Sequence, residues 1–565
     1  MKKNSILIIT FFLSILTLVF NSASAAIPTL IMRIIDLLIL AIITVEIIRG
    51  LRTADYKRQF FLRNIPLIIF ASVYLIILGY MITADFISTP GDGSRYFSLV
   101  AKVLRSLFLL YRMFEEVKSL EQALHRLNDR PALSIISSFM AIITIGTLLL
   151  MLPPATADGR GLRFLDAWFT ATSAVCVTGL IVVDTAAVFS LTGKIIILAL
   201  IQTGGLGIMI MTYFSMFILR RKATLAEKQR LSFVISDTDI SGITTTLKKI
   251  IYLTFSIEAA GALLLFTGFG RESGFSGRTI FNAVFHSISA FCNAGFSLFS
   301  DSLEGFVSRP LIIFTVSALI ILGGLSFAVI FNLAAFFNPS SKVRKLNINT
   351  RIVLSWTAVL LLLGFFFFYA SEHGGSLRSY STPTQYIAAF FQSVTLRTAG
   401  FNSIGFSGFS TGTILIMCFF MFIGAASGST AGGIKINTTA VIAAYLKCIA
   451  LNSPRVTLYR HQLSERRVLR AFAVFFYGVT AVLAGSTALA LTHNAPLRDI
   501  LFEAVSAFGT VGLSTGMTAK LNSFGKVVII FLMFNGRLGP LTILSTFSGR
   551  SESGVRYPQG DILIG

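Results

Sequence analysis

Four glycines recur at nearly even spacing in this chain of 565 residues, and their surroundings are alike. They are Gly179, Gly295, Gly400 and Gly512, separated by 116, 105 and 112 positions, each with a phenylalanine ten positions before it. Small or hydroxylated side chains stand immediately before each glycine, so the backbone carbonyls are the groups available for chemistry. Rings of backbone carbonyls can replace the hydration shell of a monovalent cation. The spacing therefore indicates four segments that coordinate an ion together.

Each candidate site consists of a glycine and the three positions before it, and we call these stretches the glycine segments. Glycine has access to φ > 0 and places no side chain between the backbone and an ion. The candidate residues are Cys176, Val177, Thr178, Gly179, Cys292, Asn293, Ala294, Gly295, Arg397, Thr398, Ala399, Gly400, Gly509, Thr510, Val511 and Gly512. A single copy would be better explained by tight packing of membrane helices through small residues. Four copies at equivalent places favour a pore.

The composition excludes an ordinary soluble protein. Hydrophobic residues make up 54% of the chain and charged residues 13%, the mean hydropathy is +0.80, and several windows reach the ~20 apolar residues that span a bilayer. The net charge of +22 would suit a nucleic-acid-binding protein, but the Lys and Arg residues gather in short loops between apolar segments. That distribution is typical of cytoplasmic loops. We therefore expect membrane lipid, and no nucleic acid, around the protein.

Each glycine segment follows a short helix and lies between two predicted membrane spans. The predicted spans are, in order, Ala132–Leu152 and Lys194–Leu219, Ile250–Phe269 and Pro310–Leu333, Ile352–Tyr369 and Thr411–Lys447, and Val468–Leu491 and Phe524–Phe547. The basic linkers fall between these pairs, so the glycine segments are expected to face the outside. Non-helical backbone at membrane depth must be buried in protein or line a wet cavity. Four such loops meet this condition by lining one common pore.

These patterns predict an all-α integral membrane fold, with four tandem helix–pore-loop–helix repeats around a pseudo-fourfold pore. The predicted domains are N-terminal membrane helices and an amphipathic linker (1–131), pore repeats at 132–219, 247–337, 351–448 and 468–547, and a cytoplasmic C-terminus (548–565). Residues 1–26 fit both a signal peptide and a retained first helix. The N-terminal region has acidic and basic helices that could form a voltage-sensor-like unit, although an accessory helical domain is the favoured interpretation.

A run of small residues, Gly424–Gly433, interrupts the second span of the third repeat. Its glycines are Gly424, Gly428, Gly432 and Gly433. Each weakens a helix by about 1 kcal/mol relative to alanine, which predicts a broken helix with a loop in the middle. The alternative is a face for close helix packing. Lys435 follows the run directly, and Arg537 lies deep in the last span, where a cation usually faces a cavity or a partner. We predict that this loop obstructs the pore below the glycine segments and that Arg537 lies beside it.

Two further polar residues lie in apolar stretches. Glu258 could serve the ion pathway, but a structural hydrogen bond to a neighbouring helix is the favoured interpretation, and His286 is also expected to be structural. The cysteines and histidines have no metal-site spacing, and the sequence has no catalytic constellation. An enzyme is therefore not expected.

The region from about Ala132 to the C-terminus resembles the Trk/Ktr/HKT superfamily of potassium transporters, and most of all its TrkH and KtrB membrane subunits. The motifs that carry the resemblance are Val177-Thr-Gly-Leu180, Gln202-Thr-Gly-Gly-Leu-Gly207, Asn293-Ala-Gly-Phe296, Arg397-Thr-Ala-Gly-Phe401, Gly428-Ser-Thr-Ala-Gly-Gly-Ile-Lys435, Gly512-Leu513, Gly536-Arg-Leu-Gly-Pro-Leu541 and the ending Arg556–Gly565. The resemblance implies potassium uptake, with K+ at the carbonyls of the glycine segments and an intramembrane gating loop at Gly424–Gly433. In this superfamily, four filter glycines go with potassium rather than sodium selectivity.

The resemblance also implies the surroundings of the protein. These are a homodimer in the bacterial inner (plasma) membrane and a cytosolic regulatory subunit resembling TrkA or KtrA. ATP, ADP or NAD(H) would bind that partner, and no organic cofactor is expected in this chain. The sequence departs from the pattern in its long N-terminal region and at Asn535, where an aliphatic residue is expected. Two alternatives stay open: a sodium or sodium-coupled transporter of the same fold, and a secondary carrier with a midplane site, which would show two inverted repeats.

Overall fold

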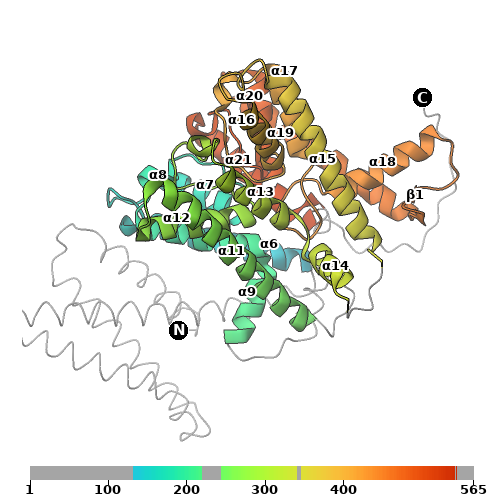
Figure 1. Cartoon of the computed structure of the whole chain (residues 1–565), viewed down its shortest axis with the longest axis horizontal. Coiled ribbons are helices and arrows are strands. Elements are labelled where there is room, and N and C mark those ends of the chain that lie inside the picture. The colour runs from blue at the N-terminus through green and yellow to red at the C-terminus, as the bar shows by residue number, and fades with distance from the viewer. Residues whose placement is uncertain (1–130, 219–242, 340–344, 541, 544–565) are drawn as a thin grey trace, which may run out of the picture. The chain divides into compact units, whose positions relative to one another are not determined.

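The computed structural model describes residues 131–218, 243–339, 345–540 and 542–543, which are helical for most of their length (Figure 1). Four predictions fall on other residues and so lie outside this description. They concern the N-terminal helices and their voltage-sensor-like pattern, the nature of residues 1–26, most of the basic loop before residue 247, and the C-terminus 548–565. Residues 130–151 and 163 onward form one compact unit, and residues 152–162 belong to a second. That second unit contains the 3-10 helix η1 (Pro153–Ala155).

The helices of the first compact unit follow one order four times: a long helix, a short helix ending in a glycine segment, and a further long or broken helix. We call each series a unit. Unit one contains α6 (Pro131–Leu150), α7 (Phe164–Val175), α8 (Thr185–Val188) and α9 (Leu191–Ile218). Unit two contains α11 (Ile243–Ser273), α12 (Gly277–Phe291), η2 (Glu304–Phe306), α13 (Pro310–Gly324) and α14 (Phe327–Phe337).

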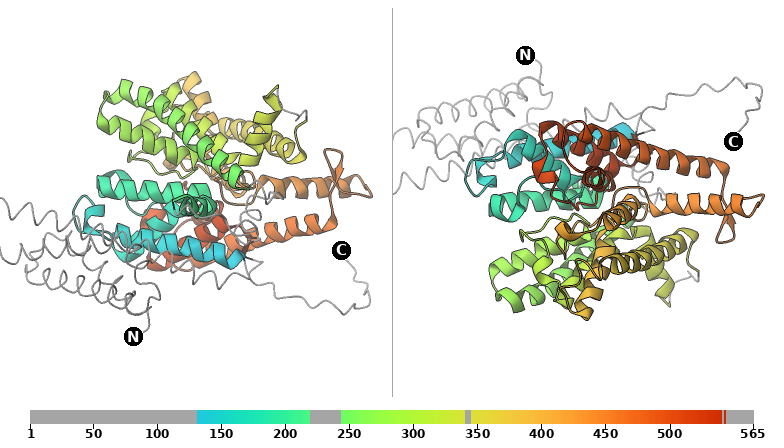
Figure 2. Two further views of the ribbon diagram at one scale, coloured as in Figure 1. Left: turned by 90° about the horizontal axis from the view of Figure 1, so that it is seen from below. Right: turned by 90° about the horizontal axis from the view of Figure 1, so that it is seen from above.

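The other two units repeat this order. Unit three contains α15 (Ile348–Glu372), α16 (Thr382–Thr395), η3 (Phe406–Gly408), α17 (Thr411–Phe422) and α18 (Ile436–Ala450). Unit four contains α19 (Glu465–Ala490), α20 (Leu497–Gly509), η4 (Thr518–Lys520) and α21 (Ser523–Leu538). Between them, β1 (Thr457–Leu458) and β2 (His461–Gln462) pair antiparallel, with Thr457 opposite Gln462. Helices α18 and α19 run side by side towards this hairpin (Figure 2).

Side-chain caps define where several helices begin. Ser276, Asn347, Ser410 and Asn522 each accept a hydrogen bond from a backbone N–H in the first turn of the helix that follows, and so satisfy a donor that has no partner within the helix. Helix α21 ends at Leu538, and the end of the predicted span, Phe547, lies outside the described residues. Gly539 takes a φ of 80° there, which ends the helix, and Pro540, Thr542 and Ile543 are helical again beyond it.

Three described helices are long and apolar enough to cross a bilayer by themselves, namely Lys248–Ser273 of α11, α15 and α19. A fourth crossing is made if α13 and α14, which meet at an angle of 101°, count as one. The predicted single span Pro310–Leu333 is therefore wrong in detail. The chain bends because Leu325 is extended and the Ser326 side chain accepts a hydrogen bond from Val329 N, which starts a new helix. The span over Lys194–Leu219 is likewise kinked, at Gly207.

The core of the compact unit that contains residues 163 onward lies around the four short helices, which are α7, α12, α16 and α20. Phe169, Phe285 and Phe502, the phenylalanines ten positions before three of the glycines, are fully buried, whereas the fourth, Phe390, is partly buried. Long helices instead expose large apolar side chains such as Leu263 and Phe366. Exposed apolar groups of this size suit contact with lipid rather than water. The short helices are thus held inside a shell of lipid-facing helices.

Candidate functional site

The glycine segments share one backbone conformation. Two positions before each glycine stand Val177, Asn293, Thr398 and Thr510, with φ of 55°, 58°, 66° and 50°. The glycines have φ of 91°, 71°, 77° and 90° in the same order. Three of these four residues are β-branched, and a β-branched residue with φ > 0 is rare and costs on the order of 1–3 kcal/mol, so this conformation at equivalent places indicates a functional constraint.

The four glycines face one another in a closed ring. A Cβ atom added to Gly179 would lie 3.1 Å from the Cα of Gly295, and one added to Gly295 would lie 2.8 Å from the Cα of Gly400. One added to Gly400 would lie 3.3 Å from the Cα of Gly512, and one added to Gly512 would lie 3.1 Å from the Cα of Gly179. The added atoms would also meet the carbonyl oxygen before the next glycine, which is 2.8 Å away for Gly295 and 2.6 Å away for Gly400. The ring therefore has no room for a side chain.

Hydroxyl groups of the short helices hold each glycine segment in place. Ser173 Oγ accepts from Gly179 N at 3.1 Å, and Ser506 Oγ accepts from Gly512 N at 3.1 Å. In the other two units the hydroxyl donates instead: Ser289 Oγ to Phe296 O and Thr395 Oγ1 to Phe401 O, both at 2.8 Å. These hydroxyls were not predicted as site residues, although their place five or six residues before each glycine is a visible signal in the sequence.

Four of the predicted site residues lie at the margin of the ring. Cys176 and Cys292 adopt right-handed helical angles and cap α7 and α12, and Gly509 is the last residue of α20. Their carbonyls therefore belong to the ends of the short helices. Arg397 is buried, with 6% of its surface exposed. Thr398 and Ala399, which follow Arg397, lead into Gly400 as the equivalent residues do in the other three segments.

The small-residue loop Gly424–Gly433 breaks the helix of unit three, as its composition predicted. Helix α17 ends at Phe422 and α18 begins at Ile436. The loop folds back on itself, because Gly424 N donates to Ile434 O at 2.8 Å and Ile436 N donates to Ala425 O at 3.1 Å. These bonds satisfy backbone groups that would otherwise be unpaired inside the membrane protein. The loop therefore has a defined backbone conformation, held by its own hydrogen bonds.

Backbone bonds join the small-residue loop to the units on either side. Thr430 N and Oγ1 donate to Gly323 O at 3.3 and 2.9 Å, and Ala426 N donates to Gly324 O at 3.2 Å, where α13 ends. Gly433 N donates to Gly536 O of α21 at 3.3 Å. A Cβ added to Gly433 would lie 3.2 Å from the Cα of Gly509, at the end of α20. The loop thus packs directly against the base of the fourth glycine segment.

Two cations bind carbonyl groups of this loop. Arg537 Nη1 donates to Thr430 O, so Arg537 lies beside the loop. Arg537 Nη2 donates to Gly204 O and, at 3.4 Å, to Gly205 O of α9. Lys435 Nζ turns back onto Ala431 O at 2.5 Å and Gly432 O at 3.3 Å. The guanidinium therefore connects the loop of unit three with unit one, and both positive charges lie next to the loop.

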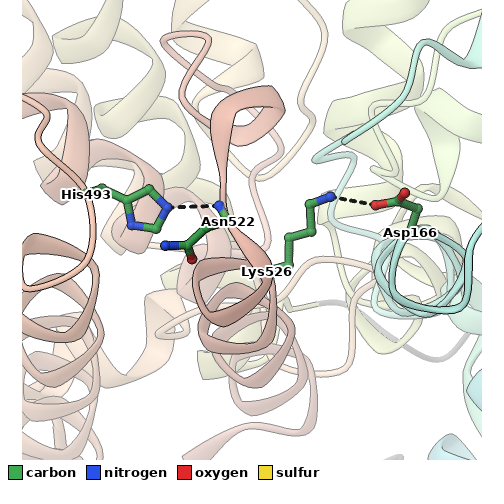
Figure 3. A network of polar contacts seen from close by, with 4 residues as sticks. All are labelled: Asp166, His493, Asn522 and Lys526. Carbon is green, nitrogen blue, oxygen red and sulfur yellow. Dashed lines mark hydrogen bonds and ion pairs between the residues drawn. The ribbon is translucent and has the colours of Figure 1, made fainter.

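Units four and one are joined by an ion pair at the start of α21 (Figure 3). Lys526 Nζ lies 2.6 Å from Asp166 Oδ1, in the first turn of α7. On the opposite side, Asn522 N donates to His493 Nε2 at 3.0 Å, just after α19. The N-terminus of α21 is therefore anchored on two sides.

Glu258 and His286 have structural partners. Glu258 accepts hydrogen bonds from Gln202 Nε2 of α9 at 3.0 and 3.2 Å, which agrees with the favoured interpretation of this acid. His286 Nδ1 lies 2.8 Å from Asn282 O in its own helix. Glu503 of α20 is a further buried acid that was not predicted from the sequence, although a carboxylate in an apolar helix is itself a functional signal.

These features define a multi-pass membrane protein built around a central axis. They are the apolar crossing helices, the four short helices that lead into the ring of glycines, and the intramembrane loop. Comparison with known families narrows this class. A family described as a cation transport protein, TrkH, matches residues 107–556, and the chain belongs to this family. It is accordingly a transport protein and not an enzyme.

Individual relatives agree with this assignment. The chain is 37% identical over 437 residues to the Ktr system potassium uptake protein B of Bacillus subtilis, covering 77% of this chain and 96% of the relative. It is 35% identical over 443 residues to the potassium/sodium uptake protein NtpJ of Enterococcus hirae, covering 77% and 97%. Its fold is similar to the crystal structure of the potassium transporter TrkH from Vibrio parahaemolyticus, with a TM-score of 0.61, 21% identity, and 85% and 97% of the two chains covered.

Proposed function

We propose that this protein takes up K+ through a pore whose selectivity filter is the ring of glycine segments. The observation that carries the proposal is the closed order in which Gly179, Gly295, Gly400 and Gly512 face one another. Carbonyls of the segments would replace the water around the ion. The proposal is supported by the relative named as a Ktr potassium uptake protein. Four tandem pore repeats in one ring also fit the geometry better than a carrier with two inverted repeats and a midplane site.

The small-residue loop is proposed as the gate of this pore. It packs against the base of the fourth glycine segment, with Gly433 close to Gly509. Lys435 and Arg537 add two positive charges beside it, which raises the barrier for a cation. Both side chains bind loop carbonyls, so opening the loop requires these hydrogen bonds to break. The closed loop and the charges together would keep resting flux low.

The proposed assembly is a homodimer in the bacterial inner membrane, regulated by a cytosolic nucleotide-binding subunit that resembles KtrA or TrkA. Its support is the Ktr system named for the relative from B. subtilis. ATP, ADP or NAD(H) would bind the regulatory subunit, whereas this chain would carry K+ and bind no organic cofactor. The proposed repeat boundaries are 132–219, 247–337, 351–448 and 468–547.

A second candidate is sodium uptake, or uptake of both ions, by the same pore. It is favoured by the relative named as a potassium/sodium uptake protein. The two candidates share the fold and the ring, and they differ in the ratio of K+ to Na+ flux.

Growth of a bacterium that lacks its own potassium uptake systems tests the proposal. The wild type, expressed with a cytosolic Ktr-type partner, should restore growth at low K+, and Gly400→Ser should lower the preference for K+ over Na+. Gly277→Ser is a matched control, because a Cβ at Gly277 meets no atom within 4 Å. Correct membrane expression without rescue by the wild type would reject potassium uptake, and Na+ flux alone would support the second candidate.

A further inference from the structure

One position on the short helices differs between units in a regular way. Nine residues before the glycines stand Thr170, His286, Phe391 and Glu503, with exposed fractions of 2%, 0%, 0% and 0%. Units two and four thus carry an imidazole and a carboxyl group, whereas units one and three carry a small hydroxyl and a ring. Burying such polar groups is costly unless they are hydrogen-bonded. Their partners therefore reveal what they do.

His286 binds the chain just beyond its own glycine. Its Nδ1 lies 2.8 Å from Asn282 O and so donates, which leaves Nε2 as an acceptor. Leu298 N donates to this Nε2 at 3.3 Å, and Ser297 Oγ lies 3.0 Å from it. Ser297 is the second residue after Gly295. The side chain of the short helix thereby holds the residues that follow the second glycine.

Glu503 does the same in unit four with different chemistry. Its Oε1 accepts from Ser514 Oγ, and its Oε2 accepts from Thr518 Oγ1 at 2.8 Å. Ser514 is the second residue after Gly512, as Ser297 is after Gly295. Ser514 Oγ also accepts from Gly516 N at 3.0 Å, which draws the following turn onto the same group. Two unrelated side chains therefore make the same connection.

Units one and three lack a pair of side chains that could form this hydrogen bond. The residue two positions after Gly179 is the apolar Ile181, and Thr170 Oγ1 has no hydrogen-bond partner in the described part of the chain. In unit three the ring of Phe391 cannot bond to Asn402. The backbone of Asn402 is instead bound to the neighbouring unit, through Ser302 Oγ at 3.1 Å and Leu303 N at 2.9 Å.

Resting on the proposed potassium uptake, we propose that His286 and Glu503 are positioning residues for discrimination between K+ and Na+. Because the glycines meet in chain order, units two and four lie opposite each other across the ring. Each tie fixes a segment of this opposite pair to the short helix of its own unit, so that its carbonyls resist moving inward to follow a smaller ion. Segment one lacks this tie, and segment three is instead bound to unit two through the backbone of Asn402, so the two opposite pairs of segments are held differently. Coordination in the ring is then twofold rather than fourfold.

The partner serines allow a test with small side-chain changes. Ser297→Ala and Ser514→Ala should each lower the K+/Na+ flux ratio about tenfold, the size of effect expected when one hydrogen bond is lost. K+ uptake itself should persist. Ser297→Thr and Ser514→Thr keep the hydroxyl and should retain the wild-type ratio. Ile181→Ala is the matched control at the equivalent position of unit one, where the ratio should not change. Glu503→Gln provides a second variant of unit four, should Ser514→Ala fail to fold.

The outcomes separate the two proposals. The flux ratio is measured with purified full-length protein and its cytosolic partner in vesicles. A lower ratio in the alanine variants, restored by threonine, supports the ties. A wild-type ratio in Ser297→Ala, Ser514→Ala and Glu503→Gln overturns them while leaving potassium uptake intact. An equal loss in Ile181→Ala also overturns them, because the effect would not be particular to units two and four. A wild type that carries no K+ rejects the proposed function instead.

Discussion

Lys526 and Asp166 form an ion pair of 2.6 Å between residues 360 positions apart in the chain. The pair joins the first turn of α21 in unit four to the first turn of α7 in unit one. The last of the four units is therefore bonded to the first. Both side chains are about four-fifths buried, with 19% and 20% exposed. Asp166 also lies at a helix N-terminus, where the helix dipole favours a negative charge. The contact closes the series of units at the level of the short helices.

Removing this ion pair should destabilise the protein. Lys526→Met leaves the Asp166 carboxylate partly buried and unpaired, and we expect a loss of about 1–3 kcal/mol, between the values for exposed and buried pairs. The measurement is thermal unfolding of the purified protein in detergent, and the swap Asp166→Lys with Lys526→Asp should recover part of the loss. Arg309→Gln is the control, because its pair with Glu272 leaves 55% of the arginine side chain exposed. Equal stability of Lys526→Met and wild type would show that the pair does not matter.

Arg537→Gln should increase resting K+ flux. It removes the positive charge beside the small-residue loop and weakens the charge-assisted bonds to Thr430 O and Gly204 O. Loss of one such bond corresponds to about tenfold in flux, if the loop opens in proportion. The flux is measured in vesicles without the cytosolic partner. Arg271→Gln, at an exposed position of α11, is the control. Unchanged flux in folded Arg537→Gln would contradict the gate.

The contributions of Asn535 and Tyr477 to the stability of the folded protein should be coupled. Tyr477 OH donates to Asn535 Oδ1 at 2.8 Å, and Asn535 Nδ2 donates to Phe531 O at 2.7 Å. Asn535→Leu alone leaves the phenol without its acceptor, and we expect a cost of about 1–3 kcal/mol in unfolding free energy. Adding Tyr477→Phe should restore most of it, because both polar groups are then gone. Additive losses in the two single variants and the double variant would rule out this coupling.

Glu304 should make stability fall as pH rises. Its burial, and the carboxylate of Asp301, raise the pKa of Glu304 above the ordinary 4.5. The folded state therefore holds this proton more tightly than the unfolded state, and stability is greatest below pH 4.5 and is lost as the pH passes the raised value. Glu304→Gln should remove this contribution. The test compares the pH dependence of unfolding for the two proteins, and parallel curves would refute it.

Several features could be predicted from the sequence because they depend on local composition. The four glycine segments, the apolar spans and the interruption at Gly424–Gly433 all follow from residue types at short separations. A glycine-rich stretch weakens a helix through its own composition, and an apolar run that is long enough can cross a bilayer. Asn535 was also visible as an exception, although its partner was not.

Tertiary structure decided which groups meet. Arg537 binds Gly204 O from 333 positions away, and no local pattern encodes that contact. The carbonyls of Gly323 and Gly324, at the bend between α13 and α14, accept hydrogen bonds from the small-residue loop of unit three. The partners of these carbonyls are therefore set by packing against another unit. The ties of His286 and Glu503 likewise became visible only when the residues beyond each glycine were placed against the short helices. Composition selects the elements, but only packing brings distant donors and acceptors within bonding distance.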